Sequence, residues 1–271
     1  MSFVEKIINT QRSKNSLLCI GLDTDLKKIP TFLKSYDDPI FEFNKRIIEQ
    51  TKDIVCAYKI NIAFYEALGS TGWQTLEKTL KIIPKEIITI ADAKRGDIGN
   101  TSELYAKAFF ETFSFDSITV NPYLGYDSVY PFINYNNKGV FILALTSNKG
   151  SSDFQYLKID GKPLYQKVVE TVIEWNQNLN CGVVIGATHP EELKVLREAA
   201  PSLPFLIPGI GAQGGDLEST IKYGCDKNKE LALINISRAI IYASSDEDFD
   251  IKSREITIEY NNKINNIRNK L

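Results

Sequence analysis

The chain has 271 residues, 43% of them hydrophobic, and its 32 basic and 34 acidic side chains leave a formal net charge of −2. This length exceeds that of a typical domain but fits one α/β barrel, and the apolar content is enough for a sizeable core. The small net charge gives no electrostatic basis for binding nucleic acid or an anionic membrane surface. Any anion that the protein binds must therefore be held by local geometry.

Targeting and membrane signals are not evident in the sequence. Residues 1–15 lack the long apolar stretch of a secretory signal, and the longest apolar runs are too short to span a bilayer. The four cysteines, Cys19, Cys56, Cys181 and Cys225, are scattered without a CxxC pair. Apolar neighbours of the first three favour buried, reduced thiols over disulfides or metal ligands. We therefore expect a cytoplasmic protein.

Short β-branched apolar runs alternate with longer amphipathic stretches along the chain. The expected strands are residues 16–22, 56–60, 87–92, 117–121, 139–145, 182–187, 205–208 and 231–236. The expected helices include residues 41–54, 73–83, 101–113, 164–178, 191–200 and 250–271. Near-continuous apolar strands separated by helices are typical of a parallel sheet that is covered on both faces.

Eight such units predict the α/β class and a (β/α)8 TIM barrel. Since no linker or composition shift divides the chain, we expect residues 1–271 to form a single catalytic domain. Residues 3–10 precede the first unit and are expected to form an extra N-terminal helix that plugs the amino-terminal end of the barrel.

Charged residues gather where the first three strands end, and in this fold functional side chains lie at the carboxyl ends of the strands. The third strand leads into ADAKRGDIGNT, residues 91–101. Alternate residues of a strand face the same way, so Asp92 and Lys94 are expected to point into the barrel mouth, with Asp97 in the loop that follows. Such closely spaced charges are tolerated in a dry cavity only when they compensate one another.

The second strand contributes Lys59 and Asn61, which share one face, and the first strand ends in Asp23. Asp23 taken alone is equally well explained by a turn or a helix cap. Together with the third strand, however, these residues predict a network of alternating lysines and carboxylates around one opening.

The last two strands carry a phosphate-binding pattern. The seventh leads into PGIGAQGGD, residues 208–216, and the eighth into NISR, residues 235–238. Glycines let backbone amides approach an anion, a helix that starts after them adds partial positive charge, and Arg238 offers a planar fork to phosphate oxygens. Because the loops after strands seven and eight form the usual phosphate site of this barrel, we expect a phosphorylated substrate.

Two further segments lie at the same end of the barrel. A loop rich in Ser and Gly, residues 146–162, follows the fifth strand and is typical of a mobile cover that also recognises the substrate. The only histidine, His189, follows the sixth strand beside Pro190. A cluster of histidine ligands for a metal is thereby excluded, and a helix-capping role for His189 is favoured over catalysis.

Taken together, these segments resemble the orotidine 5′-phosphate decarboxylase family, and most closely its longer, second type. The resemblance covers essentially the whole chain through GLD (21–23), YKIN (58–61), ADAKRGDIGNT (91–101), LTSN (145–148), PGIGAQGGD (208–216) and SRAI (237–240). The Asp-x-Lys-x-x-Asp run by itself is shared with related sugar-phosphate enzymes, so the complete set matters more than any one member.

The resemblance implies a carboxy-lyase that converts orotidine 5′-monophosphate (OMP) to uridine 5′-monophosphate (UMP), the last step of de novo pyrimidine nucleotide synthesis. It implies no cofactor and no metal. The catalytic residues that it assigns are Lys59, Asp92, Lys94 and Asp97, with Lys94 as the proton donor.

The same resemblance assigns the substrate contacts, which are Asp23, Asn61, Thr101, Ser147, Pro208, Gln213 and Arg238. Asp23 is expected at a ribose hydroxyl, Ser147 at the pyrimidine and Pro208 in the pyrimidine wall. Gln213 and Arg238 are expected to hold the phosphate. The resemblance also implies a homodimer in which Asp97 and Thr101 reach the site of the neighbouring subunit.

Three other hypotheses stay open. A metal-dependent sugar-phosphate lyase or aldolase on the same barrel would use Asp92 and a further acidic residue as Mg²⁺ ligands, but Lys59 in place of a second carboxylate disfavours it. A Schiff-base aldolase is conceivable because buried lysines can be nucleophiles. A non-catalytic protein that binds a nucleotide phosphate is the third, and the charged network disfavours it.

Overall fold

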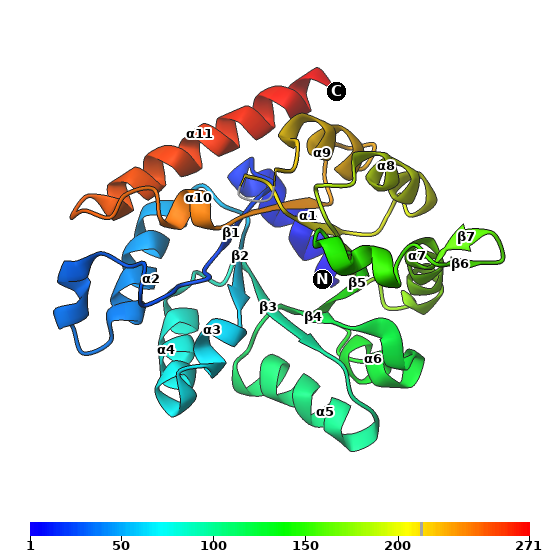
Figure 1. Ribbon diagram of the computed structural model, residues 1–271, viewed down its shortest axis with the longest axis horizontal. Helices are drawn as coiled ribbons and strands as arrows, with labels where there is room; N and C mark the ends of the chain where they lie inside the picture. The colour runs from blue at the N-terminus through cyan, green and yellow to red at the C-terminus, as the bar shows by residue number, and fades with distance from the viewer. Residues whose placement is uncertain (212–213) are drawn as a thin grey trace.

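The computed structural model describes residues 1–211 and 214–271, and within these ranges eight parallel strands close into a barrel. Their order around the barrel is β1-β10-β9-β8-β5-β4-β3-β2, and Figure 1 shows the helices arranged around it. The strands are β1 (Leu18–Gly21), β2 (Ala57–Asn61), β3 (Ile88–Arg95), β4 (Ser117–Val120), β5 (Gly139–Leu145), β8 (Cys181–Ile185), β9 (Phe205–Pro208) and β10 (Ala232–Ile236). The predicted (β/α)8 TIM barrel is confirmed.

The α-helices that cover and close this barrel differ widely in length. They are α1 (Phe3–Lys14), α2 (Pro39–Thr51), α3 (Ala63–Glu66), α4 (Gly69–Ile82), α5 (Gly99–Lys107), α6 (Tyr126–Ile133), α7 (Leu164–Trp175), α8 (Pro190–Ala199), α9 (Leu217–Gly224), α10 (Arg238–Ile241) and α11 (Phe249–Lys270). A π-helical turn (Ala108–Thr112) extends α5. An antiparallel hairpin of β6 (Lys158–Ile159) and β7 (Lys162–Pro163) projects from the loop after β5.

All eight predicted strands and all six predicted amphipathic helices are present, with ends that move by a few residues. A helix is predicted after the glycine-rich loop, where α9 lies, whereas the short helices α3, α6 and α10 are not predicted. These segments of 4 to 8 residues are too short to show a helical period, and α6 also contains Pro131, a residue that usually interrupts a helix.

The apolar residues form two clusters because each strand is covered on both faces. One cluster lies between the strands and the outer helices. The other fills the barrel interior, where Phe141, Leu206 and Leu233 are buried together with the alternate residues Ile88 and Ile90 of β3. This packed interior leaves room for a site only beyond the strand ends.

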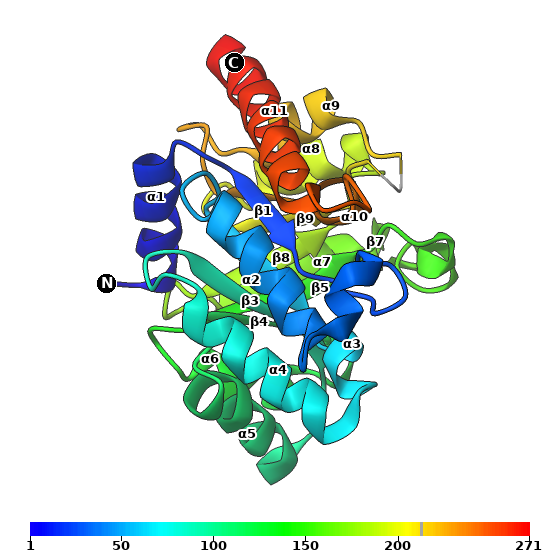
Figure 2. The same ribbon diagram turned by 90° about the vertical axis from the view of Figure 1, so that its left-hand side faces the viewer.

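Helix α1 closes the amino-terminal end of the barrel, as predicted, and extends four residues beyond the expected end, to Lys14. In Figure 2, α1 lies at one end of the barrel and the β6–β7 hairpin at the opposite end. The Phe3 ring is 1% exposed and packs edge-on against Phe141, with centroids 5.8 Å apart. A Cβ atom on Gly139 would fall 2.1 Å from Phe3 Cε1, so this close approach requires glycine.

The cysteines and the lengths of the helices can also be compared with the sequence-based expectations. Cys19, Cys56, Cys181 and Cys225 are free and buried, as expected for structural thiols. Across residues 1–211 and 214–271, no helix has both the length and the apolar character needed to traverse a lipid bilayer.

The α1 plug makes a stability prediction. Phe3→Ala should lower the free energy of unfolding by about 3 kcal/mol, because it removes a buried ring and leaves a cavity against Phe141. Phe154→Ala is the matched control, since Phe154 is 64% exposed, and should change the stability by less than about 0.5 kcal/mol. Chemical denaturation of both variants measures the difference. Equal losses would show that α1 does not act as a plug.

Candidate active site

A cavity of about 410 Å³ opens at the carboxyl ends of the barrel strands. It is lined by Asp23, Lys59, Asn61, Asp92, Lys94, Thr119, Leu143, Thr146, Ser147, Asn148, Val184, Leu206, Pro208, Gly209, Ile210, Asn235, Ser237, Arg238 and Ala239. Asp23, Lys59, Asp92 and Lys94 form the charged half of this lining, and Leu143, Val184 and Leu206 contribute apolar surface. The cavity therefore suits a ligand with a flat apolar part and anionic groups.

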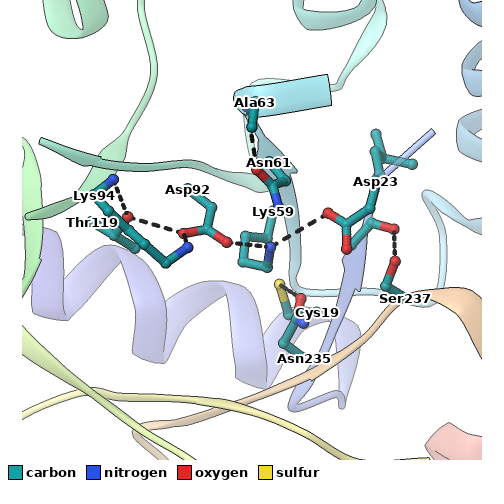
Figure 3. A network of polar contacts seen from close by, with 12 residues as sticks. Cys19, Asp23, Lys59, Asn61, Ala63, Asp92, Lys94, Thr119, Asn235 and Ser237 are labelled. Carbon is teal, nitrogen blue, oxygen red and sulfur yellow. Dashed lines mark hydrogen bonds and ion pairs between the residues drawn. The ribbon is translucent and has the colours of Figure 1, made fainter. Parts of the chain in front are cut away.

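Asp92 lies between two lysines at the centre of the charged half (Figure 3). Its Oδ2 atom accepts a hydrogen bond of 2.7 Å from Lys59 Nζ, and its Oδ1 atom accepts one of 2.5 Å from Lys94 Nζ. Thr119 Oγ1 donates to the same Oδ1 atom at 3.1 Å. Every oxygen of this carboxylate is thus engaged, and the two ammonium groups stand on opposite sides of it.

Burial and charge act in opposite directions on this group. Burial favours the neutral acid, but Lys59 and Lys94 outweigh it and hold the pKa of Asp92 far below its ordinary value. Burial likewise opposes the charge of Lys59, yet Asp23 and Asp92 outweigh it and raise the pKa of Lys59 above its ordinary value. Both groups are therefore ionised throughout the neutral range.

Lys94 reaches Asp92 through an irregularity in β3 rather than through a regular pleat. Between the paired residues Ala91–Ile118 and Arg95–Val120, residues 92–94 of β3 face the single residue Thr119 of β4. Lys94 takes a left-handed φ of +48°, and its backbone N–H donates to Thr119 Oγ1 at 3.0 Å. The bulge directs the Lys94 side chain toward the cavity, where half of that side chain stays exposed.

Asp23 and Asn61 lie beside Lys59, as the sequence predicts. Asp23 Oδ1 is 3.5 Å from Lys59 Nζ and has no hydrogen-bond partner among the described residues. Asn61 Oδ1 accepts from Ala63 N–H at 3.3 Å, which orients the amide at the start of α3 (Figure 3). An unpartnered buried carboxylate oxygen next to an ammonium is a ready acceptor for a ligand hydroxyl.

The predicted pyrimidine and phosphate residues line the other side of the cavity. Ser147, Pro208 and Arg238 are all in the lining, and Arg238 begins α10 directly after β10. Arg238 is exposed and is without an ion-pair partner in the described part of the chain. Gln213, the other predicted phosphate residue, lies outside the described residues.

The glycine-rich loop after β9 differs in one respect from the expectation. The expected partial positive charge of the following helix is already neutralised, because the carboxylate of Asp216 caps α9 and accepts from Ser219 N–H at 2.8 Å. Gly209, Gly211 and Gly214 adopt φ values of 111°, 79° and 80°, which only glycine tolerates easily. The loop therefore offers backbone amides, but not a free helix terminus, to an anion. Arg238 comes from a different segment, directly after β10.

Asp97 and Thr101 are not brought to this cavity. Neither is among the described residues of its lining. Asp97 Oδ1 accepts from the neighbouring Ile98 N–H at 2.8 Å, and Thr101 is exposed on α5. The sequence-based expectation that Asp97 joins the other charges around the opening is therefore wrong within one chain. The expectation that Asp97 reaches the site of a neighbouring subunit stays a prediction.

The sequence reasoning assigns no role to Thr119 or Asn235, which also line the cavity. Both are buried polar residues near the carboxyl ends of their strands, β4 and β10. Asn235 Oδ1 accepts a weak hydrogen bond from Cys19 Sγ at 3.7 Å. A polar residue in an otherwise apolar strand was the available signal, but a short strand does not reveal which of its residues face inward.

His189 is the N-cap residue of α8, but its side chain makes no capping hydrogen bond. The predicted capping position is therefore confirmed, but the side chain takes no part in the cap. The ring instead contacts Thr146 and Tyr156 in the loop after β5.

Comparisons with known proteins agree with this geometry. Residues 16–248 match the model of the Orotidine 5′-phosphate decarboxylase / HUMPS family. A relative from Dehalococcoides mccartyi strain CBDB1, an orotidine 5′-phosphate decarboxylase, is 52% identical over 272 residues that cover 99% of both chains.

Two solved structures from Leishmania donovani share the fold. The OMP decarboxylase superposes with a TM-score of 0.85, at 38% identity and with 99% of each chain covered. The UMP synthase gives a TM-score of 0.89 at 40% identity, and our chain spans 57% of its length. The chain belongs to the orotidine 5′-phosphate decarboxylase family.

Proposed function

We propose that this protein decarboxylates OMP to UMP, with Lys59, Asp92 and Lys94 of one chain and Asp97 of a partner chain as the catalytic residues. The observation that carries the proposal is the position of Asp92 between the ammonium groups of Lys59 and Lys94 at the mouth of the barrel. Residues 1–271 act as a single catalytic domain, and the reaction uses no cofactor.

The chemistry requires a fixed positive charge. Heterolysis of the C6–carboxylate bond releases CO2 and leaves an electron pair on C6, in the plane of the pyrimidine, where the ring π system cannot delocalise it. The Lys94 ammonium stabilises this pair and then transfers a proton to C6. Because the Lys94 side chain is half exposed, solvent can restore its proton after product release.

Asp92 keeps Lys94 aimed at the reacting carbon, and Lys59 keeps Asp92 ionised and in place. A preorganised array of this kind needs little reorganisation as charge develops, which is the main source of electrostatic catalysis. Since Asp92 lies next to the substrate carboxylate in this arrangement, loss of CO2 also removes a like charge from its surroundings.

The remaining cavity residues match the other parts of OMP. Asp23, with an oxygen that has no hydrogen-bond partner among the described residues, accepts a ribose hydroxyl beside Lys59 and Asn61. Ser147 contacts the pyrimidine edge and Pro208 its face. Arg238, with Gln213, binds the phosphate, which is far from C6 and supplies binding energy for ordering the site.

A homodimer supplies the residues that the cavity lacks. Asp97 and Thr101 are close in sequence to Ile98 and Leu104, which are 58% and 63% exposed, and Tyr123 in the turn after β4 is 83% exposed. Exposed apolar side chains at this density mark a surface that is covered in the assembled protein. A second copy that docks there delivers Asp97 and Thr101 to the partner's cavity. The proposed compartment is the cytoplasm.

Two features argue against the rival hypotheses. The Lys59 ammonium occupies the space between Asp23 and Asp92 in which a metal-dependent lyase would hold Mg²⁺. The same two carboxylates keep Lys59 protonated, whereas a Schiff-base aldolase needs a neutral amine as its nucleophile.

The direct test of activity is the ultraviolet absorbance change when the purified protein meets OMP in the presence of a metal chelator. The wild type should convert OMP, and Lys94→Ala should lose at least about 10³-fold in kcat, because it removes the charge at C6. Arg238→Ala should mainly raise KM, since it removes a remote binding contact. Activity of Lys94→Ala near that of the wild type would contradict the assignment, and loss of wild-type activity with chelator would favour the metal-dependent lyase.

The ion network should also be visible in the stability of the protein. Lys59→Met should lower the free energy of unfolding by about 3 kcal/mol at pH 7, because it leaves two largely buried carboxylates with less compensation. The matched control is Lys81→Met, which breaks an exposed pair with Glu77 and should cost less than about 0.5 kcal/mol.

The pH dependence of this difference follows from the two pKa shifts. The lowered pKa of Asp92 contributes stability above the ordinary carboxyl pKa, and that stability is lost as the pH falls through the folded value. The raised pKa of Lys59 contributes stability below the ordinary lysine pKa, and that is lost as the pH rises through the folded value. The loss caused by Lys59→Met should thus be constant between about pH 5 and pH 9 and shrink below about pH 4. A steep dependence near pH 7 would contradict this scheme.

The shared site makes a prediction about mixtures. Lys94→Ala and Asp97→Ala chains should each be inactive alone, and a mixture should regain about a quarter of wild-type activity, because hybrid dimers contain one intact composite site. Subunit exchange is verified by native mass spectrometry. Absence of recovery after confirmed exchange would show that Asp97 does not act across the interface.

A further inference from the structure

The phenol of Tyr242 holds the backbone on which Asp23 sits. Its hydroxyl donates to the carbonyl oxygen of Asp23 at 3.1 Å and accepts from the backbone N–H of Asp25 at 2.7 Å. One side chain thus engages a backbone acceptor and a backbone donor on either side of Thr24. Tyr242 itself is not among the described residues that line the cavity, so it can act on a ligand only through the residues that it holds.

The backbone at Asp23 needs this support because it lies just beyond the barrel. The N–H of Leu22 still donates to a carbonyl of β2 at 2.8 Å, and Asp23 is the next residue. On the other side, Thr24 is anchored by its Oγ1, which donates to the buried Asn44 Oδ1 at 2.6 Å. Tyr242 holds the peptide group between these two anchors and thereby limits rotation of the backbone about Asp23.

Tyr242 is itself held on a rigid base. Its ring stacks on Phe43, with centroids 5.8 Å apart and the planes at 30°, and Phe43 stacks in turn on Phe249. Its backbone N–H caps α10 and donates to the carbonyl of Arg238 at 3.2 Å. The residue that holds Asp23 is therefore bonded directly to the residue proposed to bind the phosphate.

A second contact joins the same two segments of the chain. Ser237 Oγ donates to the carbonyl oxygen of Gly21 at 2.9 Å, and a Cβ atom on Gly21 would fall 2.7 Å from Ser237 Cβ. The segment after β10 and the segment after β1 are thus in contact at two points. Burial raises the pKa of Tyr242 to about 12, so its hydroxyl keeps the proton that it donates throughout the neutral range.

The position of the Asp23 carboxylate decides whether it can bind a ligand. Its Oδ1 atom is 3.5 Å from Lys59 Nζ and has no hydrogen-bond partner among the described residues (Figure 3). A hydroxyl donates to an oxygen over only about 2.5 to 3.0 Å, so a carboxylate that moves by about 1 Å loses such a bond. Whatever fixes the backbone of Asp23 therefore contributes to recognition.

We propose that Tyr242 is a positioning residue for recognition of the ribose, and that its hydroxyl keeps the Asp23 carboxylate where it accepts a ribose hydroxyl. Because Tyr242 belongs to the same short segment as Arg238, it also fixes the ribose contact relative to the phosphate contact. The inference rests on the proposed function, since that function assigns Asp23 to the ribose.

The test compares three nucleotides, UMP, 2′-deoxy-UMP and 3′-deoxy-UMP, whose Kd values are measured by calorimetry with the wild type and with Tyr242→Phe. This substitution removes the hydroxyl and keeps the ring that stacks on Phe43, so the variant retains its packing. Tyr242→Phe should bind UMP about tenfold more weakly than the wild type, because a hydrogen bond to a charged acceptor is worth at least this much.

The deoxy analogues separate positioning from a merely structural role. For at least one of them, the Kd values of Tyr242→Phe and the wild type should be equal, because the hydroxyl that Asp23 accepts is missing and there is no bond to lose. A general loss of folded protein cannot produce this pattern, since it weakens the binding of all three nucleotides alike.

Tyr58→Phe is the matched control. It also removes a buried tyrosine hydroxyl, which is 2.6 Å from Thr51 Oγ1 and does not contact the segment after β1. The Kd values of this variant should differ from those of the wild type by the same factor for UMP and for both analogues.

Two results would overturn the inference. Tyr242→Phe could lose affinity equally for all three nucleotides, which would place its effect on the whole site or on the phosphate contact, or it could bind UMP as tightly as the wild type. In either case, decarboxylation of OMP by the wild type would leave the proposed function standing. Failure of the wild type to bind UMP would overturn both.

Discussion

The interaction on which the site depends is the double ion pair of Asp92. One carboxylate accepts from two ammonium groups, one buried and one half exposed. The buried partner, Lys59, is held next to Asp92, because among the described residues only Asp23 and Asp92 compensate its charge. The exposed partner, Lys94, is held in direction but remains open to a ligand. A single acidic residue thus ties a reactive ammonium to the rigid wall of the barrel.

The regular strands of the barrel provide this rigidity, and the bulge in β3 is a place at the site where a strand departs from regular geometry. In a regular strand, Lys94 would be paired with a residue of β4 by backbone hydrogen bonds. Instead, residues 92–94 face Thr119 alone, and Lys94 adopts a left-handed backbone that Thr119 supports by accepting its N–H. The irregular backbone lies where the chemistry needs a side chain to leave the pleat, and the same strand contributes Ile88 and Ile90 to the packed interior. The fold and the site are therefore joined at one irregular strand end.

The sequence predicts much of this architecture because period and composition are local signals. Sequence patterns predict the eight apolar strands, the plug formed by α1 and the charges at the ends of β1, β2 and β3. Lys94 was correctly expected beside Asp92, although for a reason, regular alternation, that the structure replaces with a bulge. Asp97 was misplaced because the path of a loop depends on tertiary contacts. Thr119 and the true contacts of His189 escaped because they join residues 27 and 43 positions apart, respectively, which no local pattern records.

The proposed reaction requires that the Lys94 ammonium, held by Asp92, points at the carbon that loses its carboxylate. The most direct measurement is a crystal structure of the protein with UMP bound, in which the distance from Lys94 Nζ to C6 of the pyrimidine can be read. This distance should be about 3 to 3.5 Å, the separation of atoms poised for proton transfer, with both Asp92 ion pairs intact. A complex in which UMP fills the cavity but Lys94 turns away from C6, or Lys59 lies nearer to it, would rule out Lys94 as the proton donor.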